Sequence, residues 1–155
     1  MLKLPPYFFS ILLFLPLGGI LADERLDKSV SPETFLEAFI EAFNAQDAKI
    51  LKKVFNEPLI RATNGKVTSY SSWNDYIDYQ KIKSTGWVKS IINSSSVPFE
   101  DEDSAVLKMN FSRLDSAGKT IVRSDVTYLL IKTNKTMWKI ATVIIPTAVP
   151  VSTGD

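Results

Sequence analysis

The chain has no cysteine and no histidine among its 155 residues. Without cysteine there can be no disulfide, so the fold must depend on its hydrophobic core. Without histidine or cysteine, Ser-His-Asp and Cys-His nucleophilic catalysis, the usual zinc sites and haem held by an axial histidine are excluded. Any catalysis would use Asp, Glu, Lys, Tyr, Arg or Ser, and the sequence predicts neither a metal site nor a cofactor.

The chain also lacks an excess of either charge, with 18 basic and 17 acidic residues. A protein that binds nucleic acid, or the surface of an anionic membrane, normally carries a clear positive excess. The balanced composition therefore indicates no nucleic-acid partner.

The first 22 residues have the pattern of a secretory signal peptide. Lys3 supplies the positive start, residues 7–17 are almost all apolar, and Ala22 is a small residue before the polar Asp23. The apolar run is short for a membrane span, which needs about 20 residues. The sequence predicts export to the periplasm or the exterior after cleavage near Ala22. The alternative is an uncleaved N-terminal anchor, in which the signal segment is the only contact with a membrane.

After this segment we expect a flexible arm over 23–30, one domain over 31–145 and an irregular tail over 146–155. Ser31 and Pro32 are typical of a helix start, and Phe35, Phe39 and Phe43 follow at intervals of four residues, which gives one apolar face. Asp47 predicts the cap of a second short helix.

The remaining elements are a hairpin, a third helix and a series of strands. The hairpin turns at Asn64-Gly65, and the helix runs over 73–83. From Trp87 onward apolar and polar residues alternate, which predicts strands over 87–92, 105–113, 120–131 and 137–145. A loop is expected over 94–103, and its acidic end reads as a solvated turn because it lacks the spaced ligands of a calcium loop. This order predicts an α+β domain.

Several residues spread over 31–145 carry a family resemblance: Phe39, Phe43-Asn44-Ala45-Gln46-Asp47, Pro58, Gly65, Trp73, Tyr128-Leu129-Leu130 and Trp138-Lys139-Ile140. They resemble the nuclear-transport-factor-2-like (NTF2-like) superfamily of SnoaL and ketosteroid isomerase type. The resemblance implies N-terminal helices packed in the concave face of a strongly curved, mostly antiparallel sheet, a cystatin-like cone. It also implies that the mouth of the cone holds a small molecule and that the chain forms a homodimer through the outer face of its sheet.

The resemblance places the lining of the pocket around the hairpin and the third helix, at Arg61, Tyr70, Trp73, Tyr76 and Tyr79. Aromatic walls with a few polar groups suit a small apolar ligand. The alternative is that Trp73 and Tyr76 pack the helix onto the sheet, with their polar atoms at the rim.

Asp125 is the candidate catalytic residue. The resemblance to ketosteroid isomerase implies that an Asp inside the cone acts as a general base, with a Tyr as hydrogen-bond donor, and burial would raise the pKa of that Asp. Arg123 and Asp125 share one face of their strand, however, and the intervening positions are at least as apolar. That alternation favours the outer, solvated face for both residues. The absence of histidine also departs from several SnoaL-type enzymes.

Three functions follow from these features. The first is an exported, non-catalytic module that binds a small apolar ligand or a protein partner. The second is a small isomerase or lyase that uses Asp and Tyr for acid-base chemistry, and the third is a structural dimer subunit whose cone is filled by its own side chains. The discriminating observation is whether Asp125 or another acid faces the interior. An open aromatic cavity without such an acid supports binding, whereas a closed cone supports assembly.

Overall fold

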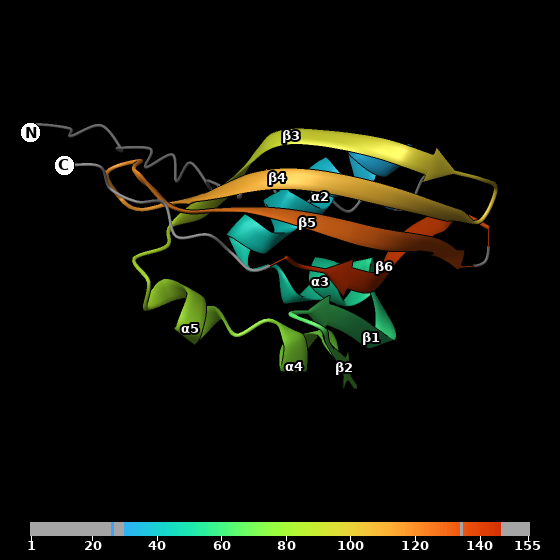
Figure 1. The fold of residues 1–155 in the computed structure, drawn as a ribbon, viewed down its shortest axis with the longest axis horizontal. Coiled ribbons are helices and arrows are strands. Elements are labelled where there is room, and N and C mark those ends of the chain that lie inside the picture. Colours follow the sequence, from blue (N-terminus) through green and yellow to red (C-terminus); the bar gives the residue numbers. More distant parts are fainter. Residues whose placement is uncertain (1–25, 27–29, 134, 147–155) are drawn as a thin grey trace, which may run out of the picture.

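The computed structural model describes residues 26, 30–133 and 135–146 (Figure 1). The predicted signal peptide over 1–22 and the tail beyond residue 146 lie outside these residues. Within the described part of the chain, no helix combines the length and the apolar character that a membrane span requires.

The first two helices begin where the sequence predicts. Helix α2 (Pro32–Ala45) is capped by Ser31, whose hydroxyl accepts a hydrogen bond from the backbone N–H of Thr34 at 3.3 Å. Helix α3 (Ala48–Val54) is capped by the Asp47 carboxylate, which accepts hydrogen bonds from two backbone N–H groups at 3.0 Å. Each cap satisfies N–H groups that have no partner within the helix.

Six strands form one mixed sheet in the order β2-β1-β6-β5-β4-β3. Their bounds are β1 (Phe55–Thr63), β2 (Lys66–Tyr70), β3 (Lys89–Glu100), β4 (Ser104–Leu114), β5 (Thr120–Thr133) and β6 (Met137–Ile144). Only the β1–β6 pair is parallel, and every other neighbouring pair is antiparallel. At the β1–β2 turn Asn64 and Gly65 have positive φ angles of 51° and 71°, as a type I′ turn requires.

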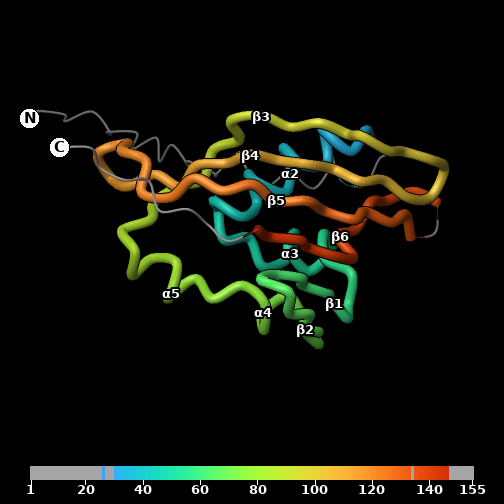
Figure 2. The backbone as a smooth tube through the Cα atoms, in the orientation of Figure 1, coloured from blue at the N-terminus to red at the C-terminus, as the bar shows by residue number. Residues whose placement is uncertain are grey.

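The helices cover one face of this curved, unclosed sheet. Helix α2 lies against β3 and β4, and α3 lies against β1 and β6 (Figure 2). On that face alternate residues of β4 and β5 are buried, among them Leu107, Met109, Val126 and Tyr128. The predicted α+β cone, with helices in the concave face of a mostly antiparallel sheet, is confirmed.

The predicted third helix is instead two short helices, α4 (Trp73–Tyr76) and α5 (Tyr79–Lys83). Ile77 between them has extended backbone angles, and the Asp78 carboxylate accepts a hydrogen bond from the N–H of Lys81 at 2.9 Å. Asp78 therefore starts a new helix inside the segment whose apolar pattern predicts a continuous one.

The strand predicted to end at residue 92 continues to Glu100, so most of the predicted loop is part of β3. This strand is at the edge of the sheet and pairs with β4 alone, with register shifts between Ile92 and Ser94 and between Ser96 and Phe99. At an edge, Pro98 can occupy a strand without removing a ladder hydrogen bond. The acidic turn that follows is exposed, as expected.

Two residues of the predicted flexible arm are described, and both are packed. Leu26 is 1% exposed, and Val30 packs against the core. The carbonyl of Val30 accepts a hydrogen bond at 2.9 Å from the indole Nε1 of Trp138, a buried residue of β6. The sequence analysis expects a flexible arm here, but these two residues pack against the core. Both are apolar, so their burial removes apolar surface from water.

Strand β6 changes its inward face part of the way along its length. Leu130 pairs with Ile140 while Leu129 pairs with Thr142, so Ala141 is an extra residue in β6. A bulge of this kind reverses the side-chain alternation after it. Without the bulge, the alternation that begins at Trp138 and Ile140 would place Val143 on the outer face. With the bulge, Val143 is buried and Ile145 packs against the core.

Candidate functional site

Three of the five sequence-predicted pocket residues line one cavity of about 450 Å³ at the mouth of the cone. They are Arg61 on β1, Tyr70 on β2 and Tyr76 on α4. The hairpin brings the first two together, because Tyr70 pairs with Leu59, which lies two residues before Arg61 and on the same face of β1. The ring of Tyr76 contacts that of Tyr70 at 5.4 Å between centroids.

A smaller chamber of about 80 Å³ adjoins the mouth on the inner side of the sheet. Most of its lining is apolar and includes Phe39, Phe55, Met109, Phe111, Val126 and Tyr128. Tyr76 and Arg113 line both the chamber and the mouth, so the two spaces are neighbours. The chamber is smaller than the cavity of about 150 Å³ that holds a benzene molecule, so it suits the end of an alkyl chain better than a ring.

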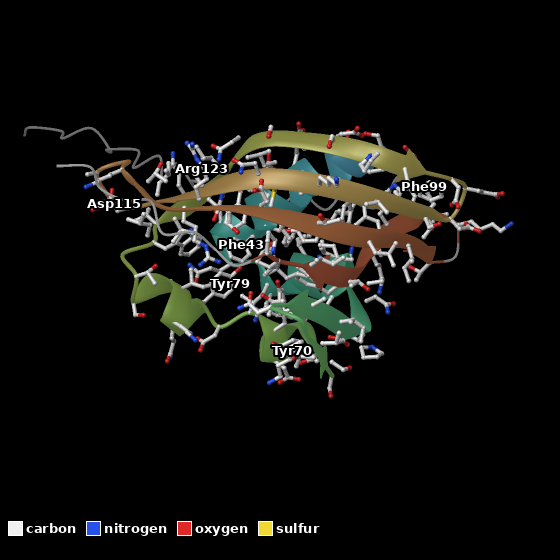
Figure 3. The ribbon with its side chains drawn as sticks, in the orientation of Figure 1. Phe43, Tyr70, Tyr79, Phe99, Asp115 and Arg123 are labelled. Atoms are coloured by element: carbon white, nitrogen blue, oxygen red, sulfur yellow. The ribbon has the colours of Figure 1, made fainter. Side chains whose placement is uncertain are left out.

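Trp73 and Tyr79 line neither of these spaces. Trp73 is 8% exposed and belongs to the core, as the packing alternative expects. The Tyr79 hydroxyl donates to the carbonyl of Phe43 at 2.8 Å, and its ring lies 5.2 Å from the Phe43 ring (Figure 3). Burial raises the pKa of Tyr79 well above its ordinary value. Both residues therefore hold helices to the core.

Arg113 is a site residue that the sequence analysis does not identify. It follows Met109 and Phe111 at steps of two on β4, so the alternation of the strand directs it inward. Its guanidinium lies 5.9 Å from the centre of the Phe111 ring. The same alternation could have identified Arg113, but an arginine at the end of a strand is more readily read as solvent-facing.

Arg61 and Arg113 share an unusual feature at the mouth. The Nε atom of each is buried and has no hydrogen-bond partner. A buried donor without a partner typically costs about 1–3 kcal/mol of stability. Such unpaired groups call for an explanation, since nearly all buried polar groups in folded proteins have partners.

Burial shifts the pKa values of the two tyrosines and of Arg113 at this site. Burial raises the pKa of Tyr76 to about 12, and the nearby Arg61 and Arg113 oppose part of that rise. Burial also raises the pKa of Tyr128 well above its ordinary value. Both tyrosines therefore keep their protons at neutral pH and can donate hydrogen bonds. Burial lowers the pKa of Arg113, but arginine remains charged in proteins.

Asp125 is exposed, and its carboxylate accepts a hydrogen bond at 2.8 Å from the side-chain amide of Asn110, its partner on β4. Its neighbours Ser124 and Val126 are buried. Arg123 is exposed as well and lies apart from Phe43 and Tyr79 in Figure 3. Among the described residues that line the chamber there is no Asp or Glu. Nor does any group of three or more acidic side chains in the described ranges suit a metal ion.

Comparisons with solved structures find the same fold in proteins of low sequence identity. A ketosteroid isomerase-like protein from Erwinia carotovora is 16% identical with a TM-score of 0.57, covering 82% of this chain and 98% of the other. An NTF2-like superfamily protein from Salmonella enterica is 15% identical with a TM-score of 0.53, covering 77% and 92%. A conserved protein from Planctomyces limnophilus is 11% identical with a TM-score of 0.52, covering 87% and 96%. At these identities the likeness concerns the fold alone.

A comparison with curated protein sequences finds no match to this chain. The family profile described as NTF2-like protein (DUF6841) matches residues 29–148. This range includes every described helix and strand of the cone. The chain therefore belongs to the NTF2-like protein (DUF6841) family.

Proposed function

We propose that this protein is an exported module that binds a small molecule at the mouth of its cone, with an apolar end of the ligand in the inner chamber. The observation that carries the proposal is the adjacency of the two spaces, which share Tyr76 and Arg113. A concave, mostly apolar site with a few polar groups is the usual form of a small-molecule site. Export rests on the signal-like pattern of residues 1–22.

Two structural features favour binding over the alternatives. An acid-base enzyme of the expected kind needs a carboxyl group inside the cone, but Asp125 is on the exposed side of β5 and the described chamber residues include no acid. The acid that lines the mouth, Asp78, is exposed and caps α5. A purely structural subunit would fill its cone, whereas the mouth has a free volume of about 450 Å³. Both features support a binding role without an acid-base step.

The proposal predicts that octanoate raises the melting temperature of the protein in a concentration-dependent way, because the ligand binds the folded state. It should also change tryptophan emission, since Trp87 contacts Phe43 at the wall of both spaces. In Val126→Phe the larger ring fills the chamber, and both effects should disappear. The matched control is Val106→Phe on the outward side of β4, which should respond like the wild type. Equal responses in both variants would contradict the use of the chamber.

We also propose that the chain forms a homodimer through the outer face of the sheet. Phe99, Leu129 and Ile144 are exposed on this face by 51%, 37% and 46%, and Val106 pairs with both Phe99 and Leu129. Pairing of two such faces would remove these apolar groups from water. We expect a dimeric mass by light scattering at high micromolar concentration.

In this experiment Leu129→Lys should shift the mass to that of a monomer. Val88→Lys, which adds the same charge at an exposed apolar position before β3, should leave the dimer intact. A wild-type protein that is monomeric at high micromolar concentration would rule out this interface.

A further inference from the structure

We infer that the ligand of the cone carries a carboxylate head group, which Arg61 and Arg113 bind at the mouth while an alkyl part of the ligand enters the chamber. This inference rests on the proposed function and names the chemical class of its ligand. It refines the small apolar ligand expected from the sequence into an amphipathic anion of the fatty-acid type.

The first argument is the pair of unpartnered donors. The Nε atoms of Arg61 and Arg113 are the two buried side-chain donors or acceptors without a partner among the described residues. Both arginines line the same cavity, although they come from strands β1 and β4, which are not neighbours in the sheet. The planar guanidinium presents its donors in a fixed fork that matches the two oxygens of a carboxylate. A carboxylate at the mouth would bring an acceptor to these two guanidinium groups through their terminal N–H groups.

The second argument is the charge of the mouth. Three cationic side chains line it, those of Arg61, Lys81 and Arg113, against the single carboxylate of Asp78. One oxygen of Asp78 already accepts the hydrogen bond that caps α5. The described lining of the mouth is therefore positive as a whole, although the protein as a whole is almost neutral. A low-dielectric wall around such charges strengthens their attraction for an anion.

The third argument is the contrast between the mouth and the chamber. Arg113 stands at the boundary, with its guanidinium beside Phe111 and with Tyr76 lining the same two spaces. Beyond this boundary the lining is mainly aromatic and aliphatic, and its volume of about 80 Å³ accepts the end of an alkyl chain. The protonated Tyr76 hydroxyl adds a neutral hydrogen-bond donor next to the cations. This order of groups matches a molecule with a carboxylate at one end and a hydrocarbon chain at the other.

The test is isothermal titration calorimetry with octanoate and with octanamide, which has the same chain and no charge. We expect octanoate to bind the wild type at least about tenfold more tightly, because charge-assisted hydrogen bonds are roughly twice as strong as neutral ones. Arg61→Gln and Arg113→Gln should each weaken octanoate binding by roughly tenfold and change octanamide binding by less than about twofold. The matched control is Arg123→Gln, at an exposed position outside the cone, which should bind octanoate like the wild type.

Arg113→Lys is included because it keeps the positive charge if Arg113→Gln fails to fold. It should remain folded and still bind octanoate less tightly than the wild type, since lysine lacks the planar fork. Equal affinities of the wild type for octanoate and octanamide would overturn the carboxylate assignment and leave the binding function standing. If neither compound binds the wild type, the proposed function itself fails. If Val126→Phe binds octanoate as tightly as the wild type, the ligand is held by charge at the mouth alone and its alkyl chain does not use the chamber. That result would also overturn the inference.

Discussion

Replacement of Phe39 by alanine is expected to lower the free energy of unfolding by about 3–5 kcal/mol, the range for a buried Phe. Phe39 is 4% exposed and lies on the inner face of α2. Its ring makes edge contacts with those of Phe43, Phe55 and Tyr128, at centroid distances of 6.2, 5.6 and 6.0 Å. Because the ring also borders the chamber, its removal enlarges an existing space, and the cost of such a substitution increases with the volume of the remaining cavity. Urea denaturation of both proteins measures the loss.

The matched control for this experiment is Phe99→Ala. Phe99 is 51% exposed at the edge strand β3, and surface substitutions usually change stability by less than about 0.5 kcal/mol. If the two alanine variants lose similar amounts of stability, the packing of α2 in the concave face of the sheet is not the main source of stability.

The second large effect is expected for Trp73→Ala, again about 3–5 kcal/mol if the whole indole contributes to the core. Trp73 is 8% exposed at the start of α4, and its backbone N–H donates to the Glu57 side chain at 3.2 Å. The substitution leaves this backbone hydrogen bond in place, so the loss measures the packing of the side chain. Denaturation with urea gives the value.

Tyr76→Ala is the informative comparison with Trp73→Ala. Tyr76 lines the chamber and the mouth, and its ring contacts Phe55 and Tyr70 at centroid distances of 5.8 and 5.4 Å. We expect a smaller loss of stability and a clear loss of octanoate binding in titration calorimetry. If Tyr76→Ala is as destabilising as Trp73→Ala and octanoate never shifts the wild-type melting curve, the aromatic residues are core and the filled-cone subunit takes the place of the binding module.

The sequence predicts those parts of the fold that local chemistry determines. Ser31 and Asp47 cap their helices, and Asn64-Gly65 turns the hairpin, because each of these residues acts on backbone groups within a few positions. Local chemistry also explains one error. The Asp78 cap divides the predicted third helix into two. The prediction of one continuous helix used only the spacing of apolar residues, which gives no information about a cap inside the segment.

The remaining differences depend on contacts between distant segments. Strand β3 extends to Glu100 because β4 offers it a partner along that length, which no residue within the loop reveals. Val143 turns inward because a bulge at Ala141 reverses the alternation of β6. A shift of one residue exchanges the two faces of a strand, so an undetected bulge produces this kind of error.

The candidate site could be predicted in part for the same reasons. Arg61 and Tyr70 meet because the hairpin fixes their register, and Tyr76 follows on the next helix. Tyr79 is outside the site because its hydroxyl finds the carbonyl of Phe43, 36 residues away in the sequence. Arg113 enters the site from β4, and only the three-dimensional arrangement of β4 opposite the hairpin brings it to Arg61.

The most direct test of the binding account is a crystal structure of the protein with 8-bromooctanoate, whose bromine is located by anomalous scattering. The account predicts the bromine in the chamber among Phe39, Phe55 and Val126, and the carboxylate at the mouth between Arg61 and Arg113. A bromine position outside the cone, or a chamber filled by the protein's own side chains, would contradict it.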